Sequence, residues 1–423
     1  MTTYAIQCGR LPQLSVLELE AVLPRFGVRP ESTRMQREIY SFTSVKPLLD
    51  EQVQSLQASL GGTIRIIELC RTTSDTSQVA EICTKLATEL FDGAVGKLTV
   101  GVSVWNDADT HLRPFDVART LKRGMVSAGA SLRFVTAAQN GMHLSTAQLI
   151  HNKLAWLAGD RTDTSRALEL CAIHVDGAWQ IGHTLTGQNI NSYTKRDFGI
   201  PVPDAESGML PPKLAQIMLN IALHDLKLDD VLVYDPFCGN GRVVLEARLL
   251  GLPSVGSDIV ERKTNATQEN LKWLQREYPQ ASTEPATSAT SWVGDATDAK
   301  SFAPAVALAG KLKRTVVIVA EPFLGKPLRT ELPESGRESW LAELATLYTS
   351  FFEAVLQEKQ VVTRLLVVFP RAKVAASENN EAGLYEHMID TLDRFGYSHQ
   401  RLFCYDRPDS FVRRDLVELS PTT

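Results

Sequence analysis

The sequence has few features that would place it in a membrane or in an oxidising compartment. Its 423 residues include six cysteines, scattered and without a Cys-x-x-Cys pair, so neither a disulfide framework nor a structural zinc site has support. No apolar run approaches the roughly 18 residues that a transmembrane helix needs, and the densest, 315–320, is strand-sized. The N-terminus lacks the basic and apolar segments of a secretion signal. We therefore expect a cytoplasmic protein with no membrane partner and no metal site.

An excess of basic residues is also missing. The chain has 44 Lys and Arg against 49 Asp and Glu, a net charge of -5, and its 22% of charged residues is ordinary for a globular protein. Basic residues nevertheless gather over 113–133, where Asp116 is the single acidic residue. A local basic patch can bind phosphates even on an acidic protein. We expect Arg119, Lys122 and Arg123 to contact the phosphates of a nucleic acid, and a solvated helix face is the alternative.

The length predicts two or three domains, each large enough for its own core. Residues 1–188 alternate strand-like and helix-like segments, with Asp176-Gly177 as a hairpin turn. Residues 189–212 are rich in Gly, Pro, Asn and Asp and are predicted to be a linker. From 213 to 423 strands alternate with crossover helices, and the last two strands join around 407–409. This pattern predicts a mostly parallel, doubly wound α/β sheet with an antiparallel closing strand.

The strongest chemical signal is the sequence Val231-Leu-Val-Tyr-Asp-Pro-Phe-Cys-Gly-Asn-Gly241. A hydrophobic strand ends in Asp235, and Gly239 and Gly241 then open a helix. Glycines let the backbone turn tightly and approach a ligand, and a helix N-terminus offers unpaired N–H groups to an anion. The end of the first strand of a doubly wound sheet is where such folds bind ligands.

Two further strands end in acidic residues. Asp258 ends the strand 254–258 and can accept hydrogen bonds from both ribose hydroxyls of an adenosine. Asp295 follows the next strand, and its carboxylate can accept from an adenine amine. A dinucleotide dehydrogenase is the main rival, but its third glycine is absent because Val244 holds that position. A nucleotide-free sheet with ordinary turn residues is the other alternative.

The block DPFCGNGRVVLEA followed by GSDI resembles the S-adenosylmethionine-dependent class I methyltransferases. More narrowly, the chain resembles the RNA methylases that join such a domain to an N-terminal RNA-binding THUMP module, above all the tRNA guanosine-N2 methyltransferases that modify position 10. SYTKRDFG (192–199) and GMLPPKLA (208–215) resemble the entry into that catalytic domain, and LSVLELEAVL (14–23) resembles the small ferredoxin-like domain before THUMP. The resemblance is specific over 190–325 and weak over 1–190.

This resemblance implies an organisation and a cofactor. The implied domains are a ferredoxin-like domain (1–75), a THUMP-like RNA-binding domain (76–188), a linker (189–212) and a Rossmann-like methyltransferase domain (213–423). The implied S-adenosylmethionine-binding residues are Asp235, Phe237, Gly239, Gly241, Asp258, Ile259, Asp295 and Ala296.

In that family a catalytic motif, Asp/Asn-Pro-Pro-Tyr/Phe, follows the fourth strand. This sequence has Glu321-Pro322-Phe323-Leu324 at that position, so Glu replaces Asp, Phe replaces the second Pro, and Leu replaces the aromatic residue. An exocyclic amine is a poor nucleophile because its lone pair is delocalised into the ring, and a carboxylate can orient it and accept charge as the methyl group arrives. The resemblance implies that Glu321 and Pro322 are catalytic and that Phe323 stacks on a base taken out of its helix.

The resemblance implies a tRNA guanosine-N2 methyltransferase. Tyr193 and Arg196, in the predicted linker, are candidates for contact with the substrate or with the methionine end of the cofactor, and solvent-exposed linker residues are the alternative. The partners of such an enzyme would be tRNA or another structured RNA and, as for some relatives, a small activator protein. A ribosomal RNA or DNA exocyclic-amine methyltransferase and a catalytically inactive RNA-binding relative are the alternatives.

Overall fold

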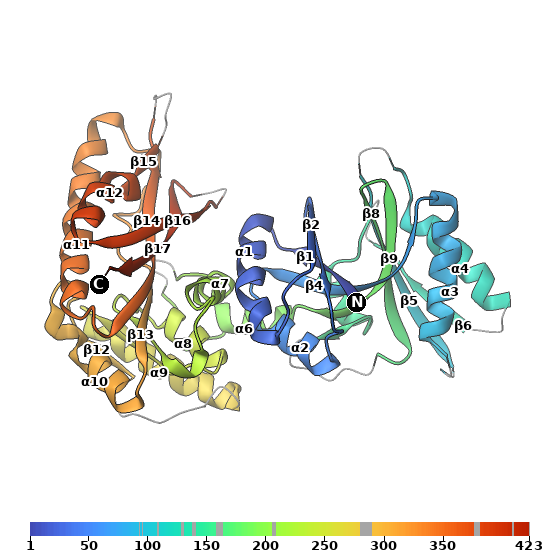
Figure 1. Cartoon of the computed structure of the whole chain (residues 1–423), viewed down its shortest axis with the longest axis horizontal. Helices are drawn as coiled ribbons and strands as arrows, with labels where there is room; N and C mark the ends of the chain where they lie inside the picture. Colours follow the sequence, from blue (N-terminus) through green and yellow to red (C-terminus); the bar gives the residue numbers. More distant parts are fainter. Residues whose placement is uncertain are drawn as a thin grey trace. The chain divides into compact units, whose positions relative to one another are not determined.

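The computed structural model describes residues 1–92, 94, 96–107, 110–127, 131–137, 141–157, 164–204, 209–279, 290–375, 381–407 and 410–422. The chain divides into two compact units, Met1–Tyr193 and Thr194–Thr423 (Figure 1). Among the helices in the described part of the chain, none combines the length and apolarity that crossing a bilayer requires.

The first unit is built on one mixed sheet with the strand order β2-β3-β1-β4-β9-β8-β5-β6, and β7 pairs with β9. Its strands are β1 (Thr2–Cys8), β2 (Ser32–Gln36), β3 (Ile39–Ser44), β4 (Thr63–Thr73), β5 (Lys97–Trp105), β6 (Ser131–Val135), β7 (Trp156–Leu157), β8 (Ala167–Val175) and β9 (Ala178–Gly187). Its helices are α1 (Pro12–Val22), α2 (Asp50–Ser59), α3 (Val79–Leu90), α4 (Pro114–Ser127) and α5 (Thr146–His151).

Helices pack on this sheet through apolar side chains spaced at the helical period. Leu19 of α1 and Leu56 of α2 are buried with side chains of β1, β3 and β4, and α3 and α4 bury their apolar faces with β5, β8 and β9. The predicted hairpin at Asp176-Gly177 is confirmed: both residues have positive φ, 51° and 76°, and join β8 to β9. That backbone geometry matches the twist of the flanking strands, which is why Asp-Gly is a favoured hairpin turn.

The predicted boundary near residue 75 does not separate two sheets. Strand β4 pairs along its length with β9, from Arg65 opposite Gly187 to Thr73 opposite Trp179. Main-chain hydrogen bonds therefore join the segments predicted as ferredoxin-like and THUMP-like into one sheet, and their division into two domains remains a prediction.

The second unit contains a sheet with the strand order β12-β11-β10-β13-β14-β17-β16, and β15 pairs with β14. Its strands are β10 (Val231–Asp235), β11 (Ser254–Asp258), β12 (Ser291–Val293), β13 (Thr315–Ala320), β14 (Val362–Lys373), β15 (Glu381–Gly383), β16 (Tyr397–Tyr405) and β17 (Val412–Pro421). Its helices are α7 (Pro212–Ala222), α8 (Arg242–Leu249), α9 (Glu261–Glu277), α10 (Ala303–Leu312), α11 (Arg337–Gln357) and α12 (Leu384–Arg394).

The predicted doubly wound sheet with an antiparallel closing strand is confirmed. Strands β10 to β14 pair in parallel, whereas β17 runs antiparallel to both β14 and β16. Helices α11 and α12 lie on one side of the sheet, and α7 and α8 lie on the other, with α7 against β14 and α8 against β10 and β11 (Figure 1). The two central strands β10 and β13 are almost entirely buried, as expected for a parallel sheet covered on both faces. Residues 408 and 409 of the predicted closing turn lie outside the described residues.

Part of the predicted linker is instead a packed helix, α6 (Ile190–Phe198). Its Tyr193 and Arg196 are 9% and 7% exposed. The polar composition of 189–212 misled the sequence interpretation because specific buried contacts, described below, stabilise this helix despite its polar sequence. Residues 205–208 of the same segment lie outside the described residues.

Candidate active site

The candidate active site lies at the carboxyl edge of the parallel sheet in the second unit. Strand β10 ends at Asp235, which pairs with Gly256 of β11, and Asp258 at the end of β11 pairs with Val293 of β12. Because neighbouring parallel strands end at the same edge, the three predicted strand-end carboxylates are brought to one side of the sheet.

The glycine loop between β10 and α8 has the geometry that its sequence predicts. Gly239 and Gly241 have φ angles of 51° and 93°, which residues with a side chain rarely adopt. A Cβ on Gly241 would come within 2.8 Å of Thr267, whereas a Cβ on Gly239 would meet nothing within 4 Å. Gly241 is held by close packing, and Gly239 borders open space that a ligand can approach.

Asp258 joins this loop to β11. Its Oδ2 accepts a hydrogen bond from Gly239 N at 3.0 Å, and its Oδ1 accepts one from Val260 N at 2.9 Å. A carboxylate has about four lone-pair positions, so two acceptor sites remain for a ligand's hydroxyl groups. Asp258 therefore fixes the loop and can still bind a ribose.

Asp295 lies at the third strand end. Its Oδ1 accepts hydrogen bonds from Thr297 N at 2.9 Å and from Thr297 Oγ1 at 2.7 Å. Oδ2 takes part in neither bond and is available to an amine. The neighbouring Ala296 is 5% exposed, and its side chain belongs to the apolar core.

Asp235 is placed differently from the other two acids. It is 3% exposed, and its Oδ1 accepts a hydrogen bond from Phe237 N at 3.0 Å. Burial raises the pKa of Asp235 well above its usual range, and the nearby carboxylates of Asp258 and Glu321 raise it further. Asp235 supports the turn, and Phe237 packs edge-on against Phe351 at 5.1 Å between ring centroids.

Exposed apolar side chains mark the same edge. In the described part of the second unit, large apolar residues are exposed at Phe198, Ile259, Val260, Val293 and Phe323. All but Phe198 lie at or just after the ends of β11, β12 and β13. A cluster of solvent-exposed apolar side chains is typical of a binding site for a flat or apolar ligand.

The predicted catalytic motif follows β13 at this edge. Glu321 accepts a hydrogen bond from Nε of Arg414 on β17, and the two side chains are 17% and 14% exposed. Pro322 is buried, and Phe323 is 48% exposed. The sequence interpretation missed Arg414, because this residue lies 93 positions after Glu321 and belongs to no recognisable motif.

The two linker residues predicted to contact the substrate have partners within the protein. Tyr193 donates its hydroxyl to Leu60 O at 3.2 Å. Arg196 forms a buried ion pair with Glu246 of α8, and its carbonyl accepts a hydrogen bond from Arg242 at 2.7 Å. These contacts give both residues a structural role, and their contact with the substrate stays a prediction.

The predicted basic patch lies on α4 and β6 of the first unit. Arg119, Lys122 and Arg123 are all exposed on α4. Asp116 forms ion pairs with both Arg113 and Arg119, so part of the positive charge is neutralised within the helix. The exposure of these side chains fits both the predicted phosphate contact and a solvated helix face, so the phosphate contact stays a prediction.

One cluster of potential metal ligands was not predicted. Glu68 and Cys70 on β4 and His183 on β9 have ligand atoms within 4.8 Å of one another. Burial raises the pKa of the Cys70 thiol to about 11, which disfavours the thiolate that metals bind. The cross-strand pairing of Glu68 with His183 creates this cluster, and no spacing in the sequence indicates it.

Comparison with known sequences finds short, similar segments. No family model matches the chain. The chain is 41% identical over 78 residues to the tRNA (guanine(10)-N2)-dimethyltransferase of Methanothermobacter thermautotrophicus. The matched segment makes up 18% of this chain and 20% of that protein. Over 65 residues it is 43% identical to the protein of the same name from Methanocaldococcus jannaschii, 15% of this chain and 18% of that protein. The matched segments thus span about a fifth of these curated relatives.

Comparison with solved structures covers nearly the whole chain. TrmN from Thermus thermophilus aligns over 99% of this chain and 100% of its own, with a TM-score of 0.52 and 14% identity. SMU.472, a candidate methyltransferase complexed with SAH, aligns over 100% of this chain and 99% of its own. The TM-score is 0.51, and the sequence identity is 11%. At these identities the similarity concerns the fold alone, and it confirms the predicted α/β fold with a Rossmann-like, mostly parallel sheet. The THUMP-like character of the first unit remains a prediction.

Proposed function

We propose that this protein is an S-adenosylmethionine-dependent RNA methyltransferase that acts on the N2 amine of guanosine in tRNA. The observation that carries the proposal is the meeting, at one sheet edge, of the Gly239 loop, the carboxylates of Asp258 and Asp295, and Glu321. The names of the sequence relatives support the choice of tRNA and of the guanine amine.

The residues at this edge fit S-adenosylmethionine. Gly239 offers open space beside its backbone, and Asp258 retains acceptor positions for the ribose hydroxyls. Asp295 Oδ2 can accept from the adenine amine, and exposed Ile259 provides an apolar surface for the adenine ring. The surrounding turns are formed by the backbone of four predicted cofactor-binding residues, Asp235, Phe237, Gly241 and Ala296. The cofactor, when bound, supplies a methyl group that is already activated on a positively charged sulfur.

Glu321 would act on the acceptor. Its carboxylate accepts a hydrogen bond from the guanine amine and holds the nitrogen in line with the methyl group. As the nitrogen–carbon bond formed, the sulfur–methyl bond of the cofactor would break and leave a neutral thioether, and the nitrogen, then positively charged, would lose a proton to the Glu321 carboxylate or to water. Pro322 fixes the chain direction, and the accessible ring of Phe323 stacks on the flipped base.

The first unit would bind the RNA. Double-stranded RNA is recognised mainly through phosphates and shape, and the exposed cations of α4 provide phosphate contacts. We propose tRNA as the partner, with a small activator protein as a further partner, and the cytoplasm as the location.

The test is transfer of labelled methyl from S-adenosylmethionine to unmodified tRNA, followed by nucleoside mass spectrometry. The proposal predicts labelled N2-methylguanosine or N2-dimethylguanosine. Label in adenosine would show that the target amine is not that of guanine. Label in ribosomal RNA or DNA, with none in tRNA, would show that the substrate is not tRNA. Cofactor binding and RNA binding without transfer, in the presence of cell extract as a source of activator, would favour a binding protein instead.

A further inference from the structure

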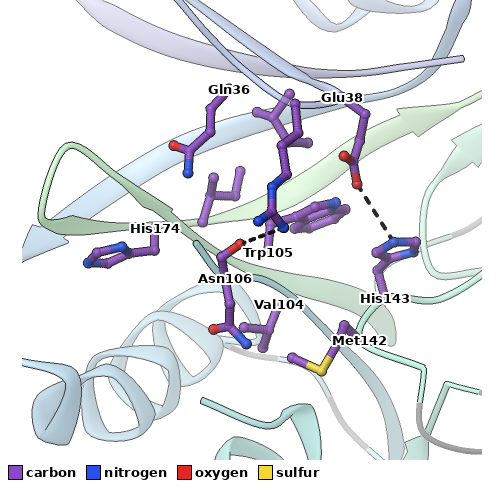
Figure 2. Close-up of a pocket in the computed structure, with 11 residues that line it drawn as sticks. Gln36, Glu38, Val104, Trp105, Asn106, Met142, His143 and His174 are labelled. Atoms are coloured by element: carbon purple, nitrogen blue, oxygen red, sulfur yellow. Dashed lines mark hydrogen bonds and ion pairs between the residues drawn. The ribbon is translucent and has the colours of Figure 1, made fainter. Parts of the chain in front are cut away.

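A cavity of about 200 Å³ lies in the first unit, apart from the residues of the candidate active site (Figure 2). The turn between β2 and β3 lines it with Gln36, Arg37 and Glu38, and the end of β5 contributes Trp105 and Asn106. His143 and His174 complete its polar lining. The volume exceeds the roughly 30 Å³ of one liquid water several times and is below the roughly 300 Å³ at which pockets for drug-sized ligands begin. It therefore suits one flat ring system.

Two stacked rings form one wall. The rings of Trp105 and His143 are 5.3 Å apart between centroids and inclined by 13°. This distance leaves no room for a third ring between them, so a ligand would extend the stack. The Trp105 residue is 8% exposed, whereas the His143 side chain is 40% exposed, so the imidazole offers the accessible face. Burial lowers the pKa of His143 below 6.5, and the ring is therefore neutral at pH 7.5.

Backbone contacts hold His143 in this position. Met142 O accepts a hydrogen bond from Val104 N at 2.7 Å, and Leu144 N donates to Ser103 Oγ at 2.9 Å. The residues on either side of His143 are thus bound to the end of β5 that carries Trp105.

A buried ion pair stiffens the structure beneath the stack. Arg65 Nη1 lies 2.5 Å from Glu169 Oε1, and both side chains are almost fully buried. Arg65 also donates to Leu144 O at 2.6 Å, and its guanidinium lies 5.7 Å from the Trp105 ring centroid. Such a network is costly to rearrange, so the stacked rings are preorganised.

Polar groups next to the stack have unused hydrogen-bonding capacity. Trp105 Nε1 and Asn106 Oδ1 are buried, and neither has a partner among the residues that the structure describes. The amide of Asn106 is oriented, because its Nδ2 donates to Leu112 O at 3.0 Å. Glu38 adds a carboxylate acceptor 3.9 Å from His143 Nε2, and both residues face the same space in Figure 2. Because Trp105 Nε1 and Asn106 Oδ1 have almost no accessible surface, the polar groups that a ligand can reach are the Glu38 carboxylate and the His143 ring, and they favour a ligand whose edge bears hydrogen-bond donors and acceptors.

Arg37 places a cation at the rim. It is exposed at the β2–β3 turn with a φ of 52°, a backbone conformation that is unfavourable for a residue with a side chain. Its guanidinium lies near Asn106, where Nη1 donates weakly to the Asn106 carbonyl at 3.4 Å. A cation at the mouth of a ring-sized cavity can meet a phosphate attached to the ring.

We propose that the cavity beside Trp105 and His143 binds one unpaired nucleobase. A base combines a flat face for stacking with edge donors and acceptors for the polar wall, and its phosphate would reach Arg37. An aromatic amino-acid side chain would leave most of those polar groups unpaired. The inference deepens the proposed function, on which the choice of RNA as the source of the base rests. The shared ligand chemistry is that of a free nucleotide and of an unstacked RNA base.

The experiment titrates CMP and AMP into the full chain by calorimetry, with ribose 5-phosphate as the base-free probe. The matched variants are His143→Ala, which removes the stacking ring, and His143→Phe, which keeps a ring. Stacking of one base contributes enough that His143→Ala should weaken binding by about five- to a hundredfold. His143→Phe should stay within about threefold of the wild type, and so should His387→Ala, an exposed histidine of α12 in the other unit.

A second arm identifies the source of the base. An unstructured RNA hexamer is compared with a blunt RNA duplex, again with both His143 variants. Tighter binding of the hexamer than of CMP, lost in His143→Ala, assigns the cavity to an unpaired base of RNA. Nucleotide binding that depends on His143, without hexamer binding, assigns it to a free nucleotide.

The proposal is overturned if neither mononucleotide binds, or if ribose 5-phosphate binds as well as CMP. It is also overturned if His143→Ala binds like the wild type or if His143→Phe binds as weakly as His143→Ala. None of these results depends on methyl transfer. A failure of the proposed function and a failure of the nucleobase pocket are therefore separate outcomes.

Discussion

Glu321 and Arg414 form an ion pair at the carboxyl edge of the second sheet, with Arg414 Nε donating to the Glu321 carboxylate. Arg414 reaches the pair from β17, where it lies opposite Pro370 of β14. The carboxylates of Asp235, Asp258 and Glu321 are close enough that the latter two raise the pKa of Asp235. The guanidinium therefore offsets negative charge at the edge and fixes the direction of the Glu321 carboxylate, to which the proposed function assigns the contact with the substrate amine.

Replacing Glu321 by glutamine should reduce methyl transfer about a hundredfold or more, because the amide is a weaker acceptor for the amine and its proton. Affinity for S-adenosylmethionine should change little, since the cofactor contacts are assigned to other residues. Turnover is measured with labelled cofactor and affinity by calorimetry. Glu334→Gln, at an exposed glutamate, is the control. Full activity of Glu321→Gln would remove this carboxylate from the mechanism.

Arg414 is a positioning residue, and Arg414→Met should lower kcat about tenfold or more with a smaller change in KM for RNA, because the carboxylate loses its fixed direction. Arg414→Lys keeps the charge and should recover part of the rate. Arg413→Met is the matched control, since Arg413 on the same strand pairs with Glu381 and Asp406 instead. Equal losses in kcat for both methionine variants would indicate general destabilisation of β17.

Asp258→Ala should weaken S-adenosylmethionine binding about ten- to a hundredfold. The substitution removes the acceptor for the ribose and the hydrogen bonds to Gly239 N and Val260 N that hold the loop. Calorimetric titration with the cofactor measures the effect. Asp298→Ala removes an acid that caps Lys300 N at 3.0 Å and should leave cofactor affinity nearly unchanged. Unaltered binding by Asp258→Ala would place the cofactor elsewhere.

Reversing the charge of Arg119, Lys122 and Arg123 together to glutamate should weaken tRNA binding and reduce its salt dependence. Each lost phosphate contact lowers the slope of log K against log salt by about one. Binding is followed by fluorescence anisotropy at several salt concentrations. The control is a second triple variant, in which exposed Arg29, Lys46 and Lys97 are replaced by glutamate. It changes the net charge by the same amount as the α4 variant. If both triple variants behave alike, the α4 cations act only through net charge.

Burial lowers the pKa of His183 from 6.5 to about 4, so stability should fall in acid. Above pH 6.5 the side chain is neutral in both states and contributes no pH dependence. Below that pH the unfolded chain binds a proton before the folded protein does, and the free energy of unfolding decreases by about 3 kcal/mol as the pH approaches 4. Urea unfolding of wild type and His183→Gln at pH 7, 5.5 and 4.5 measures this loss, which the variant should lack. His387→Gln, at an exposed site, should retain it. An equal pH dependence in wild type and His183→Gln would mean that His183 is protonated equally in both states.

Local sequence determined much of the second unit. The alternation of apolar strands and amphipathic helices implied a parallel sheet, and parallel strands must end at a common edge. The positions of Asp258, Asp295 and Glu321 therefore followed from counting along each strand. Gly239 and Gly241 indicated the loop because few other residues tolerate its φ angles.

Composition was a poorer guide where side-chain partners decide the structure. The polar segment around Tyr193 and Arg196 was predicted to be a linker, yet a buried ion pair with Glu246 and a hydrogen bond to Leu60 O hold it as a helix. Such partners lie dozens of residues away, and no local propensity reports them.

The sequence by itself thus determined which residues stand at the ends of strands and turns, because strand period, helix period and glycine geometry are local properties. Only the tertiary structure decided which distant side chains meet: Arg414 with Glu321, His143 with Trp105, and Arg65 with Glu169. These side-chain contacts depend on the strand order and on the packing between segments, and both are determined by burial of the whole core.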